Sequence, residues 1–196
     1  MYPFIETVCI EEGKIGNLAY HNRRMNKTRR EIFGSLAPLD LADYIVPEPY
    51  RERTKCRVEY GAGIGKVEYG CYRIRPVRSL QAVRCDEIEY CYKSGNRDVL
   101  NRLFVQRGEC DDILIVKNGC FTDTSICNVA FWNGTAWLTP RIPLLEGTRR
   151  ACLLDRGEMV PSDIRTEDLS QFSRIRLYNA LIKFGEIEFS VDTIVL

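Results

Sequence analysis

The second half of the chain carries a series of short, strand-like runs separated by Asn-Gly pairs, and this pattern constrains the fold most. Asn118-Gly119 and Asn133-Gly134 both favour the type I′ turn, in which two neighbouring strands form a β-hairpin. The runs around these pairs are residues 112–117, 120–124, 128–132 and 135–138. This half of the chain is therefore predicted to contain several short hairpins.

Helical patterns are mixed with strand patterns over the rest of the chain. The helical patterns cover residues 19–33, 98–107 and 147–156, with short helices expected near 39–46 and 166–170. Further strands are expected at residues 4–10, 55–60, 66–77, 82–92, 174–178 and 187–191. Because the elements follow no βαβ rhythm, an α+β fold is predicted rather than a doubly wound parallel sheet.

The chain has 196 residues, which is enough for two small domains that share an interface. Pro76-Val77-Arg78-Ser79 marks the expected crossing between them. We therefore expect a small N-terminal α/β domain at residues 1–78 and a larger C-terminal domain with a mixed sheet at residues 79–196.

The composition excludes several classes of protein. A net charge of +1 gives no global field that would attract nucleic acid, and no run is apolar enough to span a bilayer. The N-terminus lacks the pattern of a signal peptide, and the nine cysteines include no C-x-x-C, so small buried thiols in a reducing cytoplasm are expected. His21 is the only histidine, which removes Cys2His2 zinc sites, and any Ser-His-Asp or Cys-His catalytic group would depend on that residue. We expect a cytoplasmic protein without a metal site.

Two motifs have a simpler interpretation than the function they suggest. Residues 61–66 contain three glycines and a lysine, but they lack the spacing of a Walker A loop and lead into a strand, so a hairpin tip is predicted. The helix at residues 19–33 is strongly basic, which is typical of a solvated face, with nucleic-acid binding as the weaker alternative. One of its arginines could turn inward and clamp a phosphate. Its basic residues include Arg23, Arg24, Lys27, Arg29 and Arg30.

Lys93, Asp123 and Gly147 occur in an order that suits one cofactor. A buried lysine with a lowered pKa is a natural Schiff-base nucleophile, and a carboxylate can keep a pyridine nitrogen protonated. Gly147 begins a predicted helix, where the backbone N–H groups of Thr148 and Arg149 can bind a phosphate. Pyridoxal phosphate has an aldehyde, a ring nitrogen and a phosphate to match these three groups.

The ordered set of motifs resembles the class IV aminotransferase family, the pyridoxal-phosphate enzymes of fold type IV, over nearly the whole chain. Asp123 is a mild departure, because the family usually has Glu at that position. The matching segments are residues 4–7, similar to F-E-T; residues 21–25, similar to H-x-x-R-L; Lys93; Asp123; residues 125–131, which include Asn128; residues 138–140; residues 145–150, similar to L-x-G-[IT]-x-R; and residues 179–181, which begin with Asn179.

The resemblance implies a role for each of these residues. Lys93 would hold pyridoxal 5'-phosphate as an aldimine and act as the catalytic base, and Asp123 would meet the ring nitrogen. The residues implied to bind the phosphate are Arg24, Gly147, Thr148, Arg149 and Asn179. The resemblance also implies a homodimer, with the active site near the subunit boundary and between the two parts of the chain.

Within the family, the K-x-x-N-R pattern at residues 93–97 looks most like aminodeoxychorismate lyase, which converts 4-amino-4-deoxychorismate to 4-aminobenzoate and pyruvate. The alternative is a class IV aminotransferase acting on branched-chain or D-amino acids, although the G-G-N-Y pattern of branched-chain enzymes is absent. A second alternative is a non-enzymatic protein that binds an anionic partner through the basic helix. Candidate binders of a substrate carboxylate are Arg73, Arg75 and Arg141.

Overall fold

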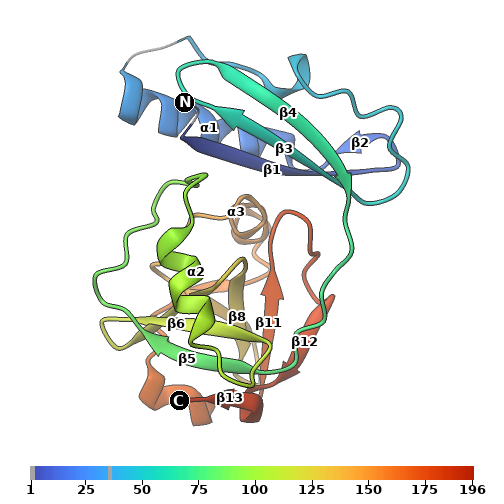
Figure 1. Ribbon diagram of the computed structural model, residues 1–196. Coiled ribbons are helices and arrows are strands. Elements are labelled where there is room, and N and C mark those ends of the chain that lie inside the picture. The colour runs from blue at the N-terminus through green and yellow to red at the C-terminus, as the bar shows by residue number, and fades with distance from the viewer. Residues whose placement is uncertain (1–2, 35–36) are drawn as a thin grey trace. The chain divides into compact units, whose positions relative to one another are not determined.

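The computed structural model describes residues 3–34 and 37–196, which form two compact units (Figure 1). The first unit comprises the described residues up to Ile74 together with Tyr92–Asn96. The second unit comprises Arg75–Cys91 and Arg97–Leu196. The sequence placed a single boundary after residue 78, and it did not predict that the segment containing Lys93 returns to the first unit.

A four-stranded antiparallel sheet with the order β2-β1-β3-β4 forms the first unit. Its longest ladder joins β1 to β3, from Phe4 opposite Tyr60 to Ile10 opposite Thr54. The elements are β1 (Phe4–Glu11), β2 (Lys14–Ile15), α1 (Leu18–Phe33), the 3-10 helix η1 (Leu41–Asp43), β3 (Thr54–Tyr60) and β4 (Ile64–Cys71). The glycine-rich residues between β3 and β4 form the hairpin tip that the sequence predicted.

Helix α1 packs against one face of this sheet (Figure 1). Alternate side chains of β1 and β3 point toward the helix, as the two-residue period of a strand requires. The core between them contains Val8, Ile10, Met25, Leu41, Ile45, Cys56, Val58 and Tyr60, all at most 4% exposed. The helix ends at Gly34, whose φ of 89° suits glycine, as predicted for this position.

The second unit is a mixed sheet of nine strands with two α-helices, which confirms the predicted mixture of helices and sheets. Two connections are parallel crossovers through a helix, β5–α2–β6 and β9–α3–β10, although the sequence indicated no βαβ units. The elements are β5 (Leu80–Arg84), α2 (Asp98–Val105), β6 (Asp112–Lys117), β7 (Cys120–Thr124), β8 (Asn128–Trp132), β9 (Trp137–Pro140), α3 (Thr148–Asp155), β10 (Val160–Ser162), the 3-10 helix η2 (Thr166–Gln171), β11 (Arg174–Tyr178), β12 (Ile187–Ser190), the 3-10 helix η3 (Val191–Thr193) and β13 (Ile194–Val195).

The two Asn-Gly pairs differ in conformation. Asn118 and Gly119 both have positive φ, at 52° and 77°, and they join β6 to β7 as predicted for a type I′ turn. At the second pair only Gly134 has a positive φ, so the predicted type I′ turn is wrong there. The Asn133 side chain instead accepts hydrogen bonds from the backbone N–H groups of Thr135 and Ala136, which lengthens the loop, and β9 begins at Trp137.

Residues 88–92, which precede Lys93, are not a strand, so the predicted strand at 82–92 is too long. Strand β5 ends at Arg84, the N–H of Cys85 still donates to the carbonyl of Val116 at 2.9 Å, and side chains hold the residues that follow. Lys117 donates to the carbonyl of Ile88 at 2.7 Å, and Asp86 accepts from the N–H of Asn118 at 2.8 Å. The alternation of apolar residues in this segment therefore does not produce strand pairing.

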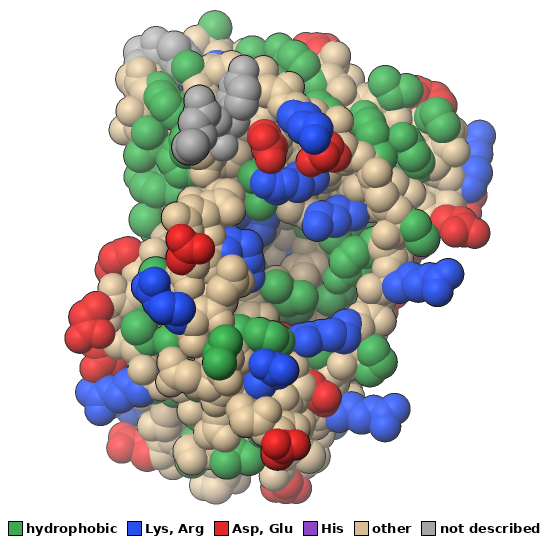
Figure 2. Space-filling model, viewed as in Figure 1, with side chains coloured by type: hydrophobic (Ala, Val, Ile, Leu, Met, Phe, Trp, Pro, Cys, Tyr) green, Lys and Arg blue, Asp and Glu red, His purple; other side chains and the backbone are tan. Residues whose placement is uncertain are grey.

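The surface carries charges of both signs, whereas fewer than half of the cysteines are buried as the sequence predicted. Basic and acidic side chains are interspersed over the face seen in Figure 2. All nine cysteines are free thiols, four of them buried. Among the described residues, no helix combines the length and apolar character needed to cross a membrane, and no group of three potential ligands for a metal ion occurs.

The first testable consequence concerns the core of the first unit. Met25 is fully buried, so Met25→Ala leaves a cavity that should lower the free energy of unfolding by about 2–5 kcal/mol. Ile32→Ala on the same helix is the matched control, because that side chain is 45% exposed. Urea denaturation measures both values, and equal losses for the two variants would contradict the packing described here.

Candidate functional site

Lys93 lies in a short segment that extends the edge of β1. The Ile5 N–H donates to the Lys93 carbonyl at 2.9 Å, and the Gly95 N–H donates to the Pro3 carbonyl at 2.8 Å. Phe4 and Ser94 form an isolated antiparallel bridge. Because β3 pairs with the other edge of β1, these contacts fix the backbone of Lys93 to a strand inside the first unit. The lysine is partly buried, whereas the sequence analysis favoured a buried lysine.

A charged cluster between β1 and α1 is formed by Glu6, His21 and Arg24. Glu6 and His21 are fully buried, and His21 Nδ1 lies 2.6 Å from Glu6 Oε2. Arg24 donates to both carboxylate oxygens of Glu6, at 2.9 and 2.6 Å. Arg24, which the family resemblance assigns to the phosphate, is thus held by a bidentate ion pair in the first unit.

Burial and charge set the ionisation of this cluster. Burial alone would raise the pKa of Glu6, but the charge of Arg24 and the contact with His21 outweigh it and lower that pKa to about 2. For His21, burial lowers the pKa, and the positive charges of Arg24 and Lys93 act in the same direction against the contact with Glu6. His21 is therefore neutral and Glu6 is ionised at pH 7. His21 lies close enough to Lys93 for the charge of the lysine to contribute to this lowered pKa.

Asp123 is the main acidic group of the candidate site in the second unit. Its side chain lies in β7, 6% exposed, and accepts hydrogen bonds from Asn128 Nδ2 and from the N–H of Leu145, both at 2.9 Å. Burial raises the pKa of Asp123 to about 6, although the two hydrogen bonds and the charge of Arg150 act against it. The site therefore holds a fixed carboxylate whose charge its neighbours compensate only in part.

Asn128 holds that carboxylate in place and explains the glycine at position 147. Its side-chain amide donates both to Asp123 and to the carbonyl of Leu145. Its amide oxygen lies 1.9 Å from the position that a Cβ on Gly147 would occupy, so any larger residue there would collide with it. The sequence motif singled out Asn128 without this role, and pairing with Asp123 across β7 and β8 explains it.

Helix α3 begins directly after Gly147, which has no side chain that could cap the helix. Thr148, its first residue, is buried. The Arg149 side chain donates to the carbonyls of Asn179 at 2.7 Å and Ala180 at 3.0 Å. The start of the helix and the loop after β11, two regions that the sequence assigned to phosphate binding, are thus tied together.

The Asn179 side chain stabilises its own loop. Its amide oxygen accepts from the N–H groups of Leu181 at 2.8 Å and Ile182 at 3.0 Å, and its nitrogen donates to the carbonyl of Ile126 at 3.2 Å. This arrangement is an Asx turn. If Asn179 contacts a phosphate as predicted, the same side-chain nitrogen and oxygen would have to serve both the turn and the phosphate.

Several arginines differ from the sequence-based expectation in their burial or in the groups they contact. Arg29 of the basic helix turns inward, is 4% exposed, and donates to the carbonyls of Ala62 and Ala37, so it stabilises the fold. Arg150 is 8% exposed and donates to the Pro140 carbonyl, and the sequence gave no signal of this burial. Two of the three candidate carboxylate binders form ion pairs, Arg75 with Asp112 and Arg141 with Asp163, each at 3.2 Å.

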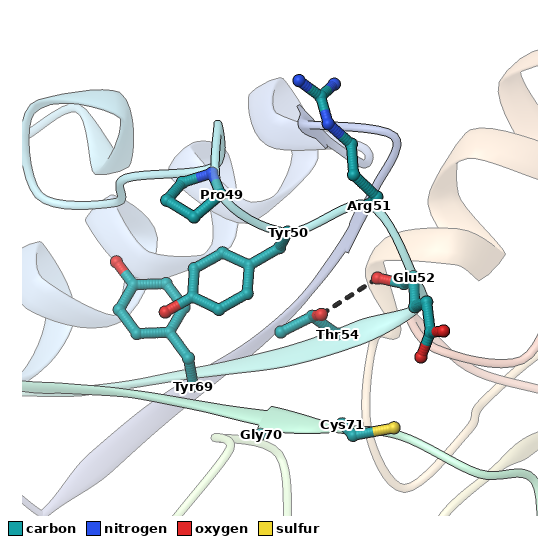
Figure 3. A pocket seen from close by; sticks show the side chains of 8 residues that line it. All are labelled: Pro49, Tyr50, Arg51, Glu52, Thr54, Tyr69, Gly70 and Cys71. Atoms are coloured by element: carbon teal, nitrogen blue, oxygen red, sulfur yellow. Dashed lines mark hydrogen bonds between the residues drawn. The ribbon is translucent and has the colours of Figure 1, made fainter.

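A cavity of about 470 Å³ in the first unit contains none of the predicted site residues. The stacked rings of Tyr50 and Tyr69 form one side of it, with centroids 4.6 Å apart (Figure 3). Thr54 donates to the carbonyl of Glu52 beside them. The cavity is lined by Pro49, Tyr50, Arg51, Glu52, Thr54, Tyr69, Gly70 and Cys71.

Comparisons with known proteins agree with this architecture. The family model described as amino-transferase class IV matches residues 88–188. An uncharacterized protein of Haemophilus influenzae is 42% identical over 185 residues, which cover 92% of this chain and 98% of that protein. The crystal structure of a "putative 4-amino-4-deoxychorismate lyase" from Haemophilus somnus 129pt has 35% identity and a TM-score of 0.86, covering 93% of this chain and 97% of that chain. The PLP-bound form of a "hypothetical aminotransferase" from Mycobacterium tuberculosis has the same fold at 16% identity, with a TM-score of 0.77 and coverage of 98% and 81%.

The first test of the site concerns Gly147. In Gly147→Ala the new methyl group collides with the Asn128 amide, so the hydrogen bond to Asp123 should break and the free energy of unfolding should fall by about 1–3 kcal/mol. Gly70→Ala is the control, because nothing lies within 4 Å of that position. Thermal unfolding of the two variants compares them, and a Gly147→Ala protein as stable as wild type would disprove the proposed clash.

The second test uses the pH dependence of stability. The pKa of Asp123 rises from 3.8 to about 6 on folding, so the folded state binds a proton more tightly than the unfolded chain. The free energy of unfolding of the ligand-free protein should therefore fall as the pH rises from about 4 to about 6, by roughly 2–3 kcal/mol in total. Asp123→Asn removes this contribution.

The pH window from 4.5 to 6 separates Asp123 from Glu6. Because the pKa of Glu6 falls from 4.5 to about 2 on folding, its contribution to stability is complete above pH 4.5 and is lost only as the pH falls toward 2. Urea denaturation at half-unit steps of pH gives the wild-type and Asp123→Asn slopes. Identical slopes in this window would show that Asp123 is not the buried, proton-binding carboxylate.

Proposed function

Because the chain belongs to the amino-transferase class IV family, we propose that it is a pyridoxal-phosphate enzyme that cleaves 4-amino-4-deoxychorismate to 4-aminobenzoate and pyruvate. The observation that carries the choice of reaction is the similarity to the Haemophilus somnus protein, 35% identical over almost the full length of both chains. The same fold is found in the PLP-bound Mycobacterium tuberculosis structure, which supports the choice of cofactor.

The residues present fit this cofactor on two observations. Neutral groups, the amide of Asn128 and the N–H of Leu145, donate to the buried Asp123, so a protonated ring nitrogen would supply the missing positive charge. The N-terminus of α3 follows a glycine, which supplies no capping side chain, and the positive end of the helix dipole suits a phosphate. Lys93, Arg24 and the loop at Asn179 are the other groups proposed to hold the cofactor.

Lys93 is the residue proposed to move the protons of the reaction. When bound, pyridoxal phosphate supplies the electron sink for the pair of electrons left on the amine-bearing carbon. Lys93 Nζ would take the proton from that carbon and hold it while the bond to the enolpyruvyl oxygen breaks. The proton would then be returned as the enolpyruvate leaves and becomes pyruvate. Asp123, held ionised against the ring nitrogen, would keep the sink effective.

An aminotransferase is the second candidate, and the family description favours it. It would use Lys93 to move the same proton to the cofactor instead of assisting the loss of pyruvate. All residues that we propose to hold the cofactor serve both reactions. The substrate decides between them, so the assay has to offer both kinds of substrate.

A homodimer remains a proposal that follows from the family resemblance. Ile126 and Ile142 of the second unit are 46% and 76% exposed, which would be consistent with an apolar contact surface on that unit. Light scattering of the purified protein would determine the mass, and a mass of one chain at micromolar concentration would contradict a stable dimer.

The proposed function predicts a yellow protein whose colour depends on Lys93. Lys93→Ala should lose the absorbance near the visible edge and should reduce the formation of 4-aminobenzoate by at least about 1,000-fold, because the base and the covalent link disappear together. Lys66→Ala, which removes an exposed lysine of β4, is the matched control and should retain both properties.

The reaction is assigned by product analysis. Wild-type protein with 4-amino-4-deoxychorismate should release 4-aminobenzoate and pyruvate in equal amounts. Exchange of amino groups between amino and keto acids, without release of 4-aminobenzoate, would overturn the lyase assignment in favour of the aminotransferase. A colourless protein inactive in both assays would contradict the cofactor as well.

A further inference from the structure

Arg57 lies on the face of the first unit's sheet that is not covered by α1. In β3 the side chains of Cys56, Val58 and Tyr60 are buried in the core against the helix. Because side chains alternate along a strand, Arg57 and its neighbour Glu59 point to the opposite face. On β1, Thr7 lies opposite Arg57 and shares that face.

The Arg57 side chain reaches across β1 toward the segment that carries Lys93. Its Nη2 atom lies 3.9 Å from the position that a Cβ on Gly95 would occupy, and Ile5 Cγ2 lies 3.7 Å from the same position. Residues 93–95 pair with the edge of β1 that faces away from β3, so about two strand spacings, roughly 9–10 Å, separate them from β3. An arginine has the length to cover that distance, and the guanidinium therefore lies beside the reactive segment.

The guanidinium retains hydrogen-bonding capacity in this position. Its Nη2 atom donates to Glu59 Oε1 at 2.9 Å, and both side chains are partly exposed, at 27% and 29%. Its Nε and Nη1 atoms make no hydrogen bond with any residue in the described part of the chain. An ion pair this exposed is weak, so Glu59 can orient the guanidinium without saturating it.

The other charges on this face leave the position positive. Glu68 of β4 lies opposite Arg57 in the ladder, but it pairs with Lys66 at 2.5 Å. Lys55, two residues before Arg57 on β3, adds a further exposed positive charge. With both acids already engaged by basic side chains, a carboxylate that arrives at Arg57 meets no uncompensated negative charge among these neighbours.

We propose that Arg57 is a substrate-binding residue that takes the carboxylate of an amine substrate whose nitrogen reacts at Lys93. This inference rests on the proposed function, because it requires that amines react at Lys93, and it assigns one residue of this chain to the carboxylate end of the substrate. A guanidinium offers two parallel N–H groups to a carboxylate, which fixes orientation as well as charge. Carboxylate-free amines gain nothing from it.

The experiment compares two amines on the same cofactor-loaded protein. One is 4-amino-4-deoxychorismate and the other is hydroxylamine, which has no carboxylate, and both are followed by the change in visible absorbance. Arg57→Ala should weaken the apparent affinity for 4-amino-4-deoxychorismate by about 10- to 100-fold, as expected for losing charge-assisted hydrogen bonds, and should leave the reaction with hydroxylamine unchanged. Arg57→Lys should recover part of the loss, and Lys14→Ala, which removes an exposed lysine of β2, should behave as wild type.

The outcomes separate this inference from the proposed reaction. Unchanged affinity of Arg57→Ala for 4-amino-4-deoxychorismate, or an equal loss with hydroxylamine, overturns the role of Arg57 even where 4-aminobenzoate is made. If the wild-type protein makes no 4-aminobenzoate, the lyase reaction is wrong, and the same comparison with L-glutamate and D-alanine decides about Arg57. A loss of affinity in Arg57→Ala that is specific to these carboxylate-bearing amines supports the role of Arg57. If the affinity for none of them depends on Arg57, that role is contradicted.

Discussion

The candidate site in the second unit depends on one hydrogen bond, from the side chain of Asn128 to the buried carboxylate of Asp123. The same amide donates to the carbonyl of Leu145, and its oxygen occupies the space that a larger residue at Gly147 would need. Strands β7 and β8 and the start of α3 are thereby tied to a single carboxylate. A buried acid is costly when nothing neutralises it, so this arrangement is consistent with a site built to receive a cation.

The first unit contributes a different kind of constraint. The backbone of Lys93 is hydrogen-bonded to the edge of β1, so its side chain projects from a segment that is tied to a strand rather than from a free loop. The cluster of Glu6, His21 and Arg24 lies on the helix side of the same strand, close enough to Lys93 for the charge of that lysine to lower the pKa of His21. An amine anchored in this way is suited to repeated covalent exchange, because its position does not have to be recovered after each reaction.

Local patterns predicted the elements whose causes are local. The Asn118-Gly119 turn, the end of α1 at Gly34 and the hairpin tip at residues 61–63 follow from residue types within a few positions, and the structure has each of them. No strand forms at residues 88–92, where the carbonyl of Ile88 is bound instead by Lys117, about thirty residues away in the sequence. The bridge between Phe4 and Ser94 is equally long-range, so no window of the sequence could indicate it.

The motifs likewise named candidate site residues without indicating what those residues contact. Lys93, Asp123 and Gly147 were found from their order, but the ion pair of Arg24 with Glu6, the inward turn of Arg29 and the reach of Arg57 depend on tertiary packing. Long charged side chains have many rotamers, and only the folded neighbours select one. This is why the sequence could name Lys93, Asp123 and Gly147 as candidates, whereas these contacts required the structure.

The central claim is that the amine of Lys93 is bonded to pyridoxal phosphate. Reduction of the purified, cofactor-loaded protein with borohydride would make that bond permanent, and proteolysis followed by mass spectrometry would locate it. The account predicts a phosphopyridoxyl group on the peptide that contains Lys93 and on no other lysine-containing peptide. A label on a different lysine, such as Lys66 or Lys117, with Lys93 unmodified, would contradict the account.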